Sequence, residues 1–346
     1  MIVEGTVKIY TGKIFSTKGP GRATSGFYNP QMIFSRDVMI SFLDAAKEIY
    51  RIEKALDALA ATGIRGIRMA KEAGLKVTIN DWNEKAYEII KKNVSFNGVD
   101  AEITKRNANS IMAERKFGYI DIDPYGSPVP FLDMAVQSVK NRGVLGVTAT
   151  DTANLSGSNP QKCFRRYMAK CTRNSVKHEV GVRILLGYIG RTAAKYDKGI
   201  SPLLSVYHGH HYRVFVAVFE GAKRADETLE MIGMTETPDG VEVGPLWTGE
   251  LHDKRILERM KIRDYFQSKK LFSKMLEIWK DEKGLFFYEL HYLSSLWKIS
   301  TPSIETVIEE LTKEGYYASR TQFSPTGIRT NARLDEFKKI VKKITR

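Results

Sequence analysis

Between residues 50 and 150, short apolar runs alternate with segments of helical periodicity. The apolar runs are KALDALA, KVTIND, AEITKR, YIDID and GVLGVTAT. Gly74 and Gly98 stand where two of the intervening helices should end, because glycine readily adopts the left-handed conformation of a helix C-cap. Strands that alternate with amphipathic helices form parallel sheets covered on both faces. The sequence therefore predicts an α/β domain built on a parallel sheet.

The carboxyl ends of these strands carry polar residues, and a parallel sheet binds its ligands at that edge. The first strand runs into LDALAATGIRG, where Asp57, small residues and Gly63 predict a turn that a ligand can approach closely. The turn lacks both the GxGxxG fingerprint and the lysine of a phosphate loop. The second strand ends at Asp81, 18 residues after Gly63, where a carboxylate can bind both ribose hydroxyls. An adenosine without phosphates fits both features, and S-adenosylmethionine is the common cofactor of that kind.

The fourth strand ends in DIDPYG, and this segment predicts chemistry on an amine. The exocyclic amine of a nucleobase is a poor nucleophile, because its lone pair is delocalised into the ring. A carboxylate and a backbone carbonyl that accept its two N–H bonds can leave the lone pair directed at a methyl donor. Asp123 supplies the carboxylate, Pro124 fixes the backbone, and Tyr125 can stack on the base.

The charge of the chain favours a polyanionic partner. It carries 54 Lys and Arg against 40 Asp and Glu, a net charge of +14. Residues 5–36 and 152–178 contain basic residues and no acid, and residues 313–346 carry nine basic and three acidic residues. Three such segments in one chain favour nucleic acid over a merely solvated surface.

Other features argue against a membrane and against zinc. No run approaches the roughly 18 apolar residues of a membrane span, and the N-terminus MIVEGTVKIY lacks a signal-peptide pattern. We therefore expect a cytoplasmic protein. Cys163 and Cys171 are expected on one helix, and two cysteines are too few for a zinc site.

Several segments resemble the archaeal and eukaryotic tRNA (guanine-N2-)-dimethyltransferase family. They are EGTVKIY, GFYNPQMIFSRD, LDALAATGIRGIR, DIDPYGSP, DTANLSG, GVRILLGYIGRTAAKYDKGISPLLS, GPLWTGEL and SRTQFSPTGIRTNA. The resemblance covers nearly the whole chain. Many members carry a four-cysteine zinc knuckle before GPLW, but this chain has no cysteine there, so we predict no structural zinc and no other metal.

The resemblance implies roles for particular residues. The cofactor would be bound by Arg36, Arg65, Asp81, Asn107 and Ala108, with Asp81 on the ribose and the last two beside the adenine. The catalytic group would be Asp123, with Phe27 and Tyr125 on the two faces of the guanine. Asp121 is interpreted as a supporting group, because alternate residues of a strand point the same way.

The chain is predicted to form two domains, residues 1–221 and 222–346. The first is a Rossmann-like S-adenosylmethionine-dependent methyltransferase domain. The second is a smaller α+β domain in which helix, turn, helix and hairpin follow one another, a winged-helix-like order. Arg320, Arg329 and the basic C-terminus are predicted to face RNA. In VYHGHHYRVFVAVFEG the alternation predicts a strand whose histidines point outward as polar residues, in preference to a metal site.

The leading hypothesis is an enzyme that transfers one or two methyl groups from S-adenosylmethionine to N2 of guanosine 26 in tRNA, by resemblance to the family. An N6-adenine methyltransferase and a catalytically silent RNA-binding protein are the alternatives. We expect tRNA as the partner, no membrane and a monomeric state. The sequence leaves open whether one or two methyl groups are added and whether a neighbouring guanosine is modified.

Overall fold

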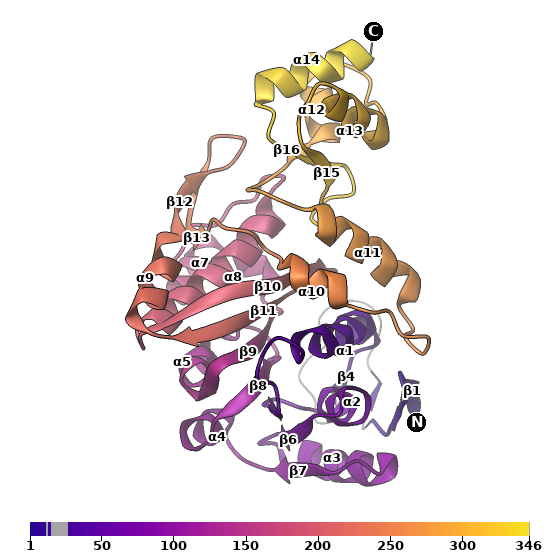
Figure 1. The fold of residues 1–346 in the computed structure, drawn as a ribbon, viewed down its shortest axis with the longest axis vertical. Coiled ribbons are helices and arrows are strands. Elements are labelled where there is room, and N and C mark those ends of the chain that lie inside the picture. Colours follow the sequence, from indigo (N-terminus) through magenta and orange to yellow (C-terminus); the bar gives the residue numbers. More distant parts are fainter. Residues whose placement is uncertain (12, 15–26, 346) are drawn as a thin grey trace.

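A computed structural model describes residues 1–11, 13–14 and 27–345, and its centre is a seven-stranded sheet (Figure 1). The strands are β5 (Lys54–Asp57), β6 (Lys76–Asn80), β7 (Ala101–Thr104), β8 (Phe117–Ile122), β9 (Val139–Ala149), β10 (Lys198–His208) and β11 (His211–Glu220). Their order is β10-β11-β9-β8-β5-β6-β7. The five strands from β9 to β7 run parallel, whereas β11 and β10 are antiparallel to their neighbours. The predicted parallel sheet is confirmed, with an antiparallel pair at one edge.

Helices cover both faces of this sheet. One face carries α1 (Ile33–Ala46), α2 (Ile64–Ala73) and α3 (Glu84–Asn97), and the other carries α4 (Ala108–Glu114), α5 (Val129–Ser138) and α8 (Lys177–Ala194). The predicted C-caps are confirmed, since Gly74 and Gly98 follow α2 and α3 with φ of 69° and 59°.

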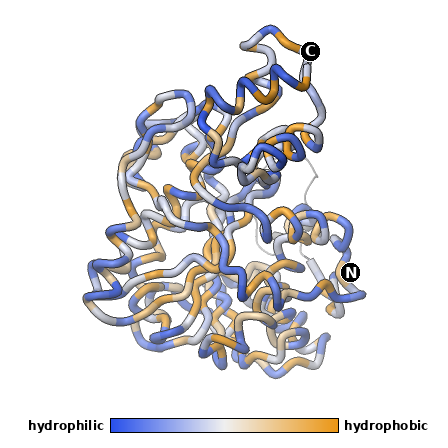
Figure 2. Tube along the Cα trace, turned by 45° about the horizontal axis from the view of Figure 1, so that its top comes forward, coloured by the Kyte–Doolittle hydropathy of each residue, from blue (hydrophilic) through white to orange (hydrophobic). Residues whose placement is uncertain are grey.

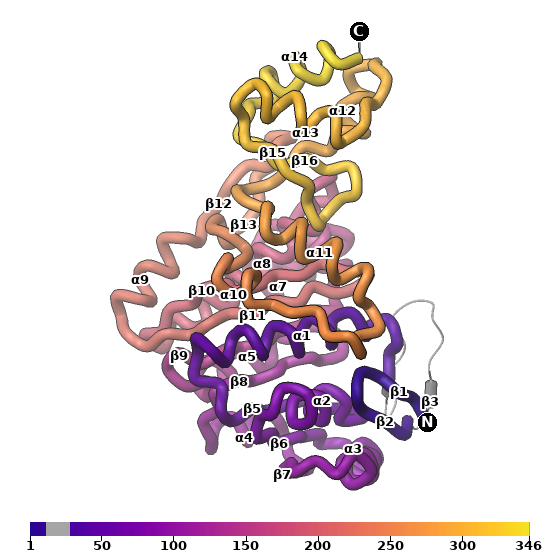
Figure 3. The backbone as a smooth tube through the Cα atoms, turned by 45° about the vertical axis from the view of Figure 1, so that its right-hand side comes forward, coloured from indigo at the N-terminus to yellow at the C-terminus, as the bar shows by residue number. Residues whose placement is uncertain are grey.

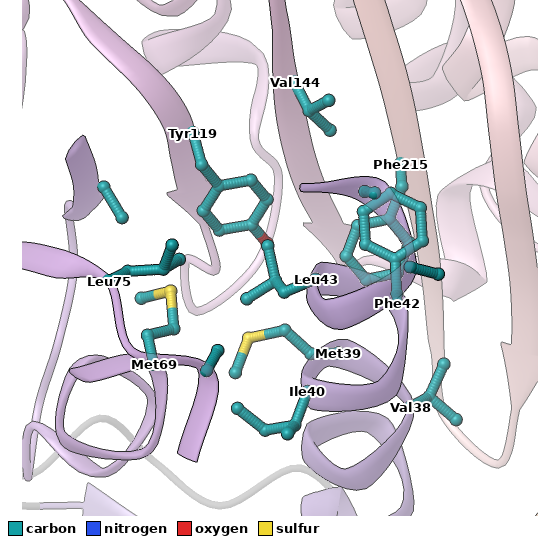
Figure 4. Packing of buried hydrophobic residues seen from close by; sticks show 14 of the residues in the cluster. Val38, Met39, Ile40, Phe42, Leu43, Met69, Leu75, Tyr119, Val144 and Phe215 are labelled. Carbon is teal, nitrogen blue, oxygen red and sulfur yellow. The ribbon is translucent and has the colours of Figure 1, made fainter. Parts of the chain in front are cut away.

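Alternate residues of the strands pack into two separate hydrophobic clusters. In β8, Tyr119 joins the cluster beneath α1, and Ile120 joins the cluster beneath α5. Phe42 of α1 stacks on Phe215 of β11 with ring centroids 4.1 Å apart, as the close-up in Figure 4 shows. Figure 2 shows hydrophobic positions gathered along the strands in the middle of the molecule. This double coverage holds the carboxyl edge of the sheet in a defined position.

The N-terminal segment is joined to the sheet domain by a buried cluster of charges. It comprises β1 (Ile2–Glu4), β2 (Val7–Ile9), β3 (Lys13–Ile14), β4 (Phe27–Tyr28) and the short 3-10 helix Pro30–Met32. Glu4 pairs with Arg36 at 2.6 Å and with Arg68 at 2.9 Å, and Arg68 also binds Asp37 and Glu72. All five side chains are buried, so the cluster fixes the N-terminal strands against α1 and α2.

The segment between β9 and α8 differs from the prediction for the cysteines. It contains α6 (Thr152–Leu155) and α7 (Pro160–Tyr167). Cys163 lies on α7, but this helix ends before Cys171, because Met168 adopts a left-handed φ of 50°. The two cysteines therefore do not share a helix, and both are free thiols.

Most of the chain after residue 221 packs on the central domain. Its elements are α9 (Ala222–Glu230), β12 (Ile232–Glu236), β13 (Glu242–Trp247), α10 (Lys254–Arg259) and α11 (Lys269–Asp281). Val243, Leu246 and Trp247 join the cluster beneath α8, and residues of α10 and α11 join the cluster beneath α1. Figure 3 shows α10 and α11 running beside α1. The domain boundary at residue 221 stays a prediction, but the hydrophobic core does not divide there.

A third hydrophobic cluster lies at one end of the molecule (Figures 1 and 3). It is formed by β14 (Tyr288–Glu289), α12 (Leu290–Trp297), α13 (Ile304–Lys313), β15 (Ala318–Arg320), β16 (Gly327–Thr330) and α14 (Leu334–Ile344). These elements follow the predicted order of helix, turn, helix and hairpin. None of the helices in the described ranges combines the length and apolar character that a membrane span requires.

The prediction that Arg329 faces RNA is wrong. Its side chain is 1% exposed and pairs with Glu179 of α8 and with Glu282, each at 2.9 Å. Arg320 remains partly exposed and pairs with Glu305. Arg329 thus joins the C-terminal elements to the central domain, a role that its sequence neighbourhood does not reveal.

Candidate active site

A cavity of about 1430 Å³ opens at the carboxyl edge of the parallel strands. It is lined by residues 28–36, the turn after β5, residues 81–89, the loop after β8, and the turn between β10 and β11, together with Thr150 and Arg166. Drug-sized ligands occupy pockets of roughly 300 to 1,000 Å³. The cavity is therefore large enough for a nucleoside cofactor and a second base together.

The turn after β5 brings the backbone of α2 close to the sheet. Gly63 has a φ of 78°, which favours glycine. A Cβ on Gly66 would lie 2.6 Å from Ile79 Cγ1, so only glycine fits there without a shift of its neighbours. The Gly66 N–H donates to Asp57 Oδ2 at 2.8 Å. Asp57 therefore holds the first turn of α2 in place beneath the cavity.

The titration of Asp57 should be visible in the stability of the protein. Burial and the nearby charge of Asp121 raise its pKa from 3.8 to about 8. The folded protein then keeps a proton that the unfolded chain releases, so this contribution is fully present below pH 4 and is lost as pH rises to about 8. One pKa unit corresponds to about 1.4 kcal/mol, so the loss between pH 5 and 8 should be about 2 kcal/mol or more.

The measurement compares the protein with the Asp57→Asn variant. Urea unfolding at pH 5 and pH 8 gives the free energy of unfolding of each, and the difference between the two proteins isolates Asp57 from other titrating groups. The free energy of unfolding of the variant, relative to that of the wild-type protein, should be higher at pH 8 than at pH 5. Parallel pH profiles of the two proteins would contradict a raised pKa.

Asp81 presents its carboxylate to the cavity just after β6. Its Oδ2 accepts a hydrogen bond from the Ala61 N–H at 2.8 Å and its Oδ1 accepts one from the Asn83 N–H at 2.9 Å. Burial raises the pKa of Asp81 against these two hydrogen bonds. Each carboxylate oxygen accepts one backbone hydrogen bond and keeps another lone pair, so Asp81 can also accept hydrogen bonds from the two hydroxyls of a diol. Next to it, Trp82 lines the cavity with 75% of its surface exposed, a contact that the sequence reasoning missed.

Asp123 lies in the cavity wall directly after β8, where it meets Arg65. Arg65 Nε and Nη2 lie 2.8 and 2.7 Å from Asp123 Oδ2. Burial opposes ionisation of Asp123, but the charges of Arg65 and Arg213 and a hydrogen bond from Thr148 outweigh it and lower its pKa. The carboxylate is thus ionised and 21% exposed, and it can accept hydrogen bonds from a ligand.

The supporting role expected of Asp121 agrees with its contacts. Its carboxylate is fully buried, accepts a hydrogen bond from the Tyr119 hydroxyl at 2.7 Å, and pairs with Arg213 of β11. Arg213 also donates to the Thr148 hydroxyl at 2.7 Å. This group ties β8, β9 and β11 together directly behind Asp123.

The predicted cofactor residues are only partly brought together. Arg36, Arg65 and Asp81 line the cavity, although Arg36 is held by Glu4 and Arg65 by Asp123. Asn107 and Ala108 start α4 and are not among the residues that line the cavity; Asn107 caps that helix by accepting a hydrogen bond from the Asn109 N–H. The cofactor role of all five residues stays a prediction.

The two predicted stacking residues differ in how they can be placed. Tyr125 lines the cavity with 56% of its surface exposed. The side chain of Phe27 lies outside the described part of the structure, although its backbone forms β4. Their contact with a base stays a prediction.

The histidine-rich hairpin between β10 and β11 differs from the expectation of outward polar residues. His208 and His211 pair across this turn and both line the cavity, together with His210. His211 is only 4% exposed. Within the described residues, no group of three or more His, Cys, Asp or Glu side chains is placed to hold a metal ion.

Comparisons with known proteins give a consistent result. The family model for N2,N2-dimethylguanosine tRNA methyltransferase matches residues 6–342. The tRNA (guanine(26)-N(2))-dimethyltransferase of Thermoplasma volcanium is 40% identical over 348 residues, covering 99% of this chain and 98% of the relative. The Pyrococcus furiosus protein of the same name is 42% identical over 360 residues, covering 92% of each chain.

A solved structure shows that the likeness extends to the fold. It is the complex of Trm1 from Pyrococcus horikoshii with S-adenosyl-L-methionine, and it superimposes with a TM-score of 0.89 at 38% identity. The match covers 98% of this chain and 99% of that one. The Rossmann-like methyltransferase fold predicted from the sequence is thereby confirmed.

Proposed function

The chain belongs to the N2,N2-dimethylguanosine tRNA methyltransferase family, and on that premise we propose how its cavity transfers methyl groups from S-adenosylmethionine to N2 of guanosine 26 in tRNA. The observation that carries the proposal is the ionised carboxylate of Asp123 in the wall of a cavity that also presents Asp81. The carboxylate of Asp81 suits the hydroxyls of a ribose, and the carboxylate of Asp123 suits the amine of a base.

The cavity fits the cofactor at the turn after β5 and at the end of β6. Asp81 would bind the ribose hydroxyls, and the exposed ring of Trp82 offers an apolar face beside it. A Cβ at Gly63 or Gly66 would meet Ile90 or Ile79, so glycine lets the start of α2 pack closely beside the turn after β5. When bound, S-adenosylmethionine supplies an electrophilic methyl group.

Asp123 prepares the acceptor. Its carboxylate would accept an N–H of the guanine amine, and the backbone carbonyl of Pro124 would accept the other, so the nitrogen lone pair is freed from the ring. Because its pKa is lowered by Arg65 and Arg213, Asp123 is ionised when the base arrives. N2 loses one proton for each methyl group that it gains, and this carboxylate is placed to accept that proton. Arg65 keeps the carboxylate oriented before the base arrives.

The target guanine must leave the RNA stack to reach Asp123. Extrusion of a base costs a few kcal/mol. Stacking on an aromatic side chain contributes roughly 1 to 3 kcal/mol per base, and we assign this role to Tyr125 and Phe27. Tyr125 borders the cavity beside Asp123, which suits that role.

The basic face of α7 adjoins the cavity and suits the phosphates of tRNA. Arg166 lines the cavity and pairs with Asp151, whereas Lys162, Arg165 and Arg173 are exposed and have no acidic partner within the described ranges. Phosphate contacts position a nucleic acid and depend on salt. We infer that α7 holds the tRNA while its guanosine enters the cavity.

Reversal of two of these charges should weaken tRNA binding without changing the chemistry. In the Lys162→Glu, Arg165→Glu variant, the Michaelis constant for tRNA should rise more than tenfold and the turnover number should change less. The slope of log K for tRNA binding against log salt concentration should decrease in magnitude by about 1 to 2, since each lost phosphate contact lowers the magnitude of this slope by about 0.9.

The control reverses two exposed lysines at the opposite edge of the sheet. Lys54 and Lys76 start β5 and β6, far from the carboxyl ends of these strands. The Lys54→Glu, Lys76→Glu variant has the same net charge as the α7 variant. Equal losses of tRNA affinity in both variants would show that net charge, and not α7, governs binding.

The remaining inferences concern the state of the protein. We infer that it works in the cytoplasm as a monomer. We also infer that it needs no structural zinc, because no cysteine lies between the FVAVFEG strand and the GPLW segment. The C-terminal elements from β14 to α14 form their own hydrophobic cluster and are inferred to contribute to tRNA binding.

The test of this function uses unmodified tRNA made by transcription. After incubation with the protein and S-adenosylmethionine, nucleoside analysis should find N2-methylguanosine and N2,N2-dimethylguanosine. A transcript with adenosine at position 26 should accept no methyl groups. Methylated adenosine, or equal transfer to both transcripts, would contradict the proposal.

A further inference from the structure

The ring of His211 has an unsatisfied nitrogen in the cavity wall. Its Nε2 is buried, and no residue in the described part of the chain gives it a hydrogen bond. The whole side chain is 4% exposed, yet it lines the cavity. A buried polar atom without a partner costs about 1 to 3 kcal/mol, so it calls for a ligand that completes it.

The sheet register places His211 beside Asp123. Arg213 lies opposite Thr148 of β9, and its side chain reaches Asp121 of β8. Residues two apart in a strand share a face, so His211 lies on the face of Arg213 and Asp123 on the face of Asp121. β11 runs antiparallel to β9 and β8, so lower residue numbers in β11 and higher numbers in β8 lie nearer the carboxyl edge. His211 and Asp123 are therefore each two residues nearer this edge than the Arg213–Asp121 pair.

His211 is a neutral ring in this position. Burial lowers its pKa to about 3. The negative charge of Asp123 raises the pKa, but burial and the charges of Arg65, His208 and Arg213 outweigh this effect. A neutral imidazole has one nitrogen that donates and one that accepts. It can therefore pair with a polar base edge without bringing a charge into the cavity.

We propose that His211 binds the edge of the extruded guanine that continues from N2 to N1–H and O6, and thereby positions the amine on Asp123. This inference rests on the proposed function and deepens it. Asp123 takes the amine, and the next polar groups along the same base edge are N1–H and O6. The buried nitrogen of His211, on the same face of the sheet, meets that edge. His211 is a specificity-determining residue, and Asp123 remains the acceptor for the amine.

The test is a cycle of residue and base changes. The variants are His211→Phe, which keeps the ring shape but no nitrogen, and His211→Gln, whose amide reaches the place of Nε2. The substrates are tRNAs with guanine or 2-aminopurine at position 26. 2-Aminopurine keeps the N2 amine but lacks N1–H and O6.

On guanine, His211→Phe should lower kcat/KM about 10- to 100-fold, and His211→Gln should recover most of it. On 2-aminopurine, kcat/KM of the wild-type protein should already be low. His211→Phe should lower kcat/KM on this base by a further factor of less than about three. Cofactor affinity, measured by calorimetry, should stay within a few fold in both variants, which also shows that they are folded.

A second, partly buried histidine provides the control. His178 of α8 is outside the cavity lining, and its Nδ1 already bonds the Tyr212 hydroxyl at 2.9 Å. A His178→Phe variant should lower the rates on both bases by the same factor. If His211→Phe does the same, or keeps the wild-type rate on guanine, the proposal is wrong. Failure of the wild-type protein to methylate guanosine 26 would instead refute the proposed function.

Discussion

Replacing Asp123 by asparagine should lower the rate of methyl transfer to tRNA at least about 100-fold, while cofactor affinity changes only a few fold. Asparagine has nearly the same volume, but its oxygen carries no charge and its NH₂ group cannot accept the N–H of an amine. Asp81, the carboxylate proposed to bind the ribose, follows β6 and is held by the N–H groups of Ala61 and Asn83, so the substitution leaves it untouched.

The loss should appear in the turnover number rather than in tRNA affinity. Asp123 is proposed to contact one base, whereas the phosphates are proposed to be held by α7. Single-turnover methyl transfer with saturating enzyme separates chemistry from binding. An Asp133→Asn variant is the matched control, because Asp133 is a surface carboxylate on α5 that pairs with Lys195. Turnover of Asp123→Asn within tenfold of wild type would exclude this carboxylate as the group that activates the amine.

The second large effect is expected on stability, from Arg329→Met. Arg329 neutralises Glu179 and Glu282, both buried, and donates to the carbonyl oxygen of Phe286 at 3.0 Å. Removal of one partner from a buried ion pair costs roughly 3 to 5 kcal/mol, because the other charges are left uncompensated. The pKa of Glu282 is lowered against burial mainly by Arg329, so the carboxylate depends on this residue.

The control for this prediction is Arg320→Met on the neighbouring strand. Arg320 and Glu305 are both partly exposed, and exposed ion pairs contribute about 0 to 1 kcal/mol. Urea unfolding followed by circular dichroism gives both values. A loss below about 1 kcal/mol for Arg329→Met would show that the buried cluster does not hold the C-terminal elements on the central domain.

The elements of the fold followed from local patterns in the sequence. The apolar runs of β5, β6, β7, β8 and β9, the helices between them and the C-caps at Gly74 and Gly98 are where periodicity and glycine predict them. The position of a strand end also follows from the sequence, because the carboxyl ends of parallel strands meet at one edge of the sheet. For this reason Asp81 and Asp123 could be placed on the cavity from the sequence alone.

The contacts that were missed join residues far apart in the chain. Arg65 meets Asp123, Arg36 meets Glu4, and Arg329 meets Glu179, and no local pattern distinguishes a buried arginine from one that faces RNA. His211 was misplaced for a related reason. Alternation predicts which residues of a strand share a face, but only the sheet order shows that this face borders the cavity.

The most direct test is a crystal structure of the protein with S-adenosylhomocysteine and tRNA. The account predicts that guanosine 26 is extruded into the cavity, with N2 within hydrogen-bond distance of Asp123 and roughly 3 to 4 Å from the place of the transferred methyl group. Asp81 should bind the ribose of the cofactor. A guanosine 26 that stays stacked in the RNA, or a base that enters with its amine directed away from Asp123, would contradict it.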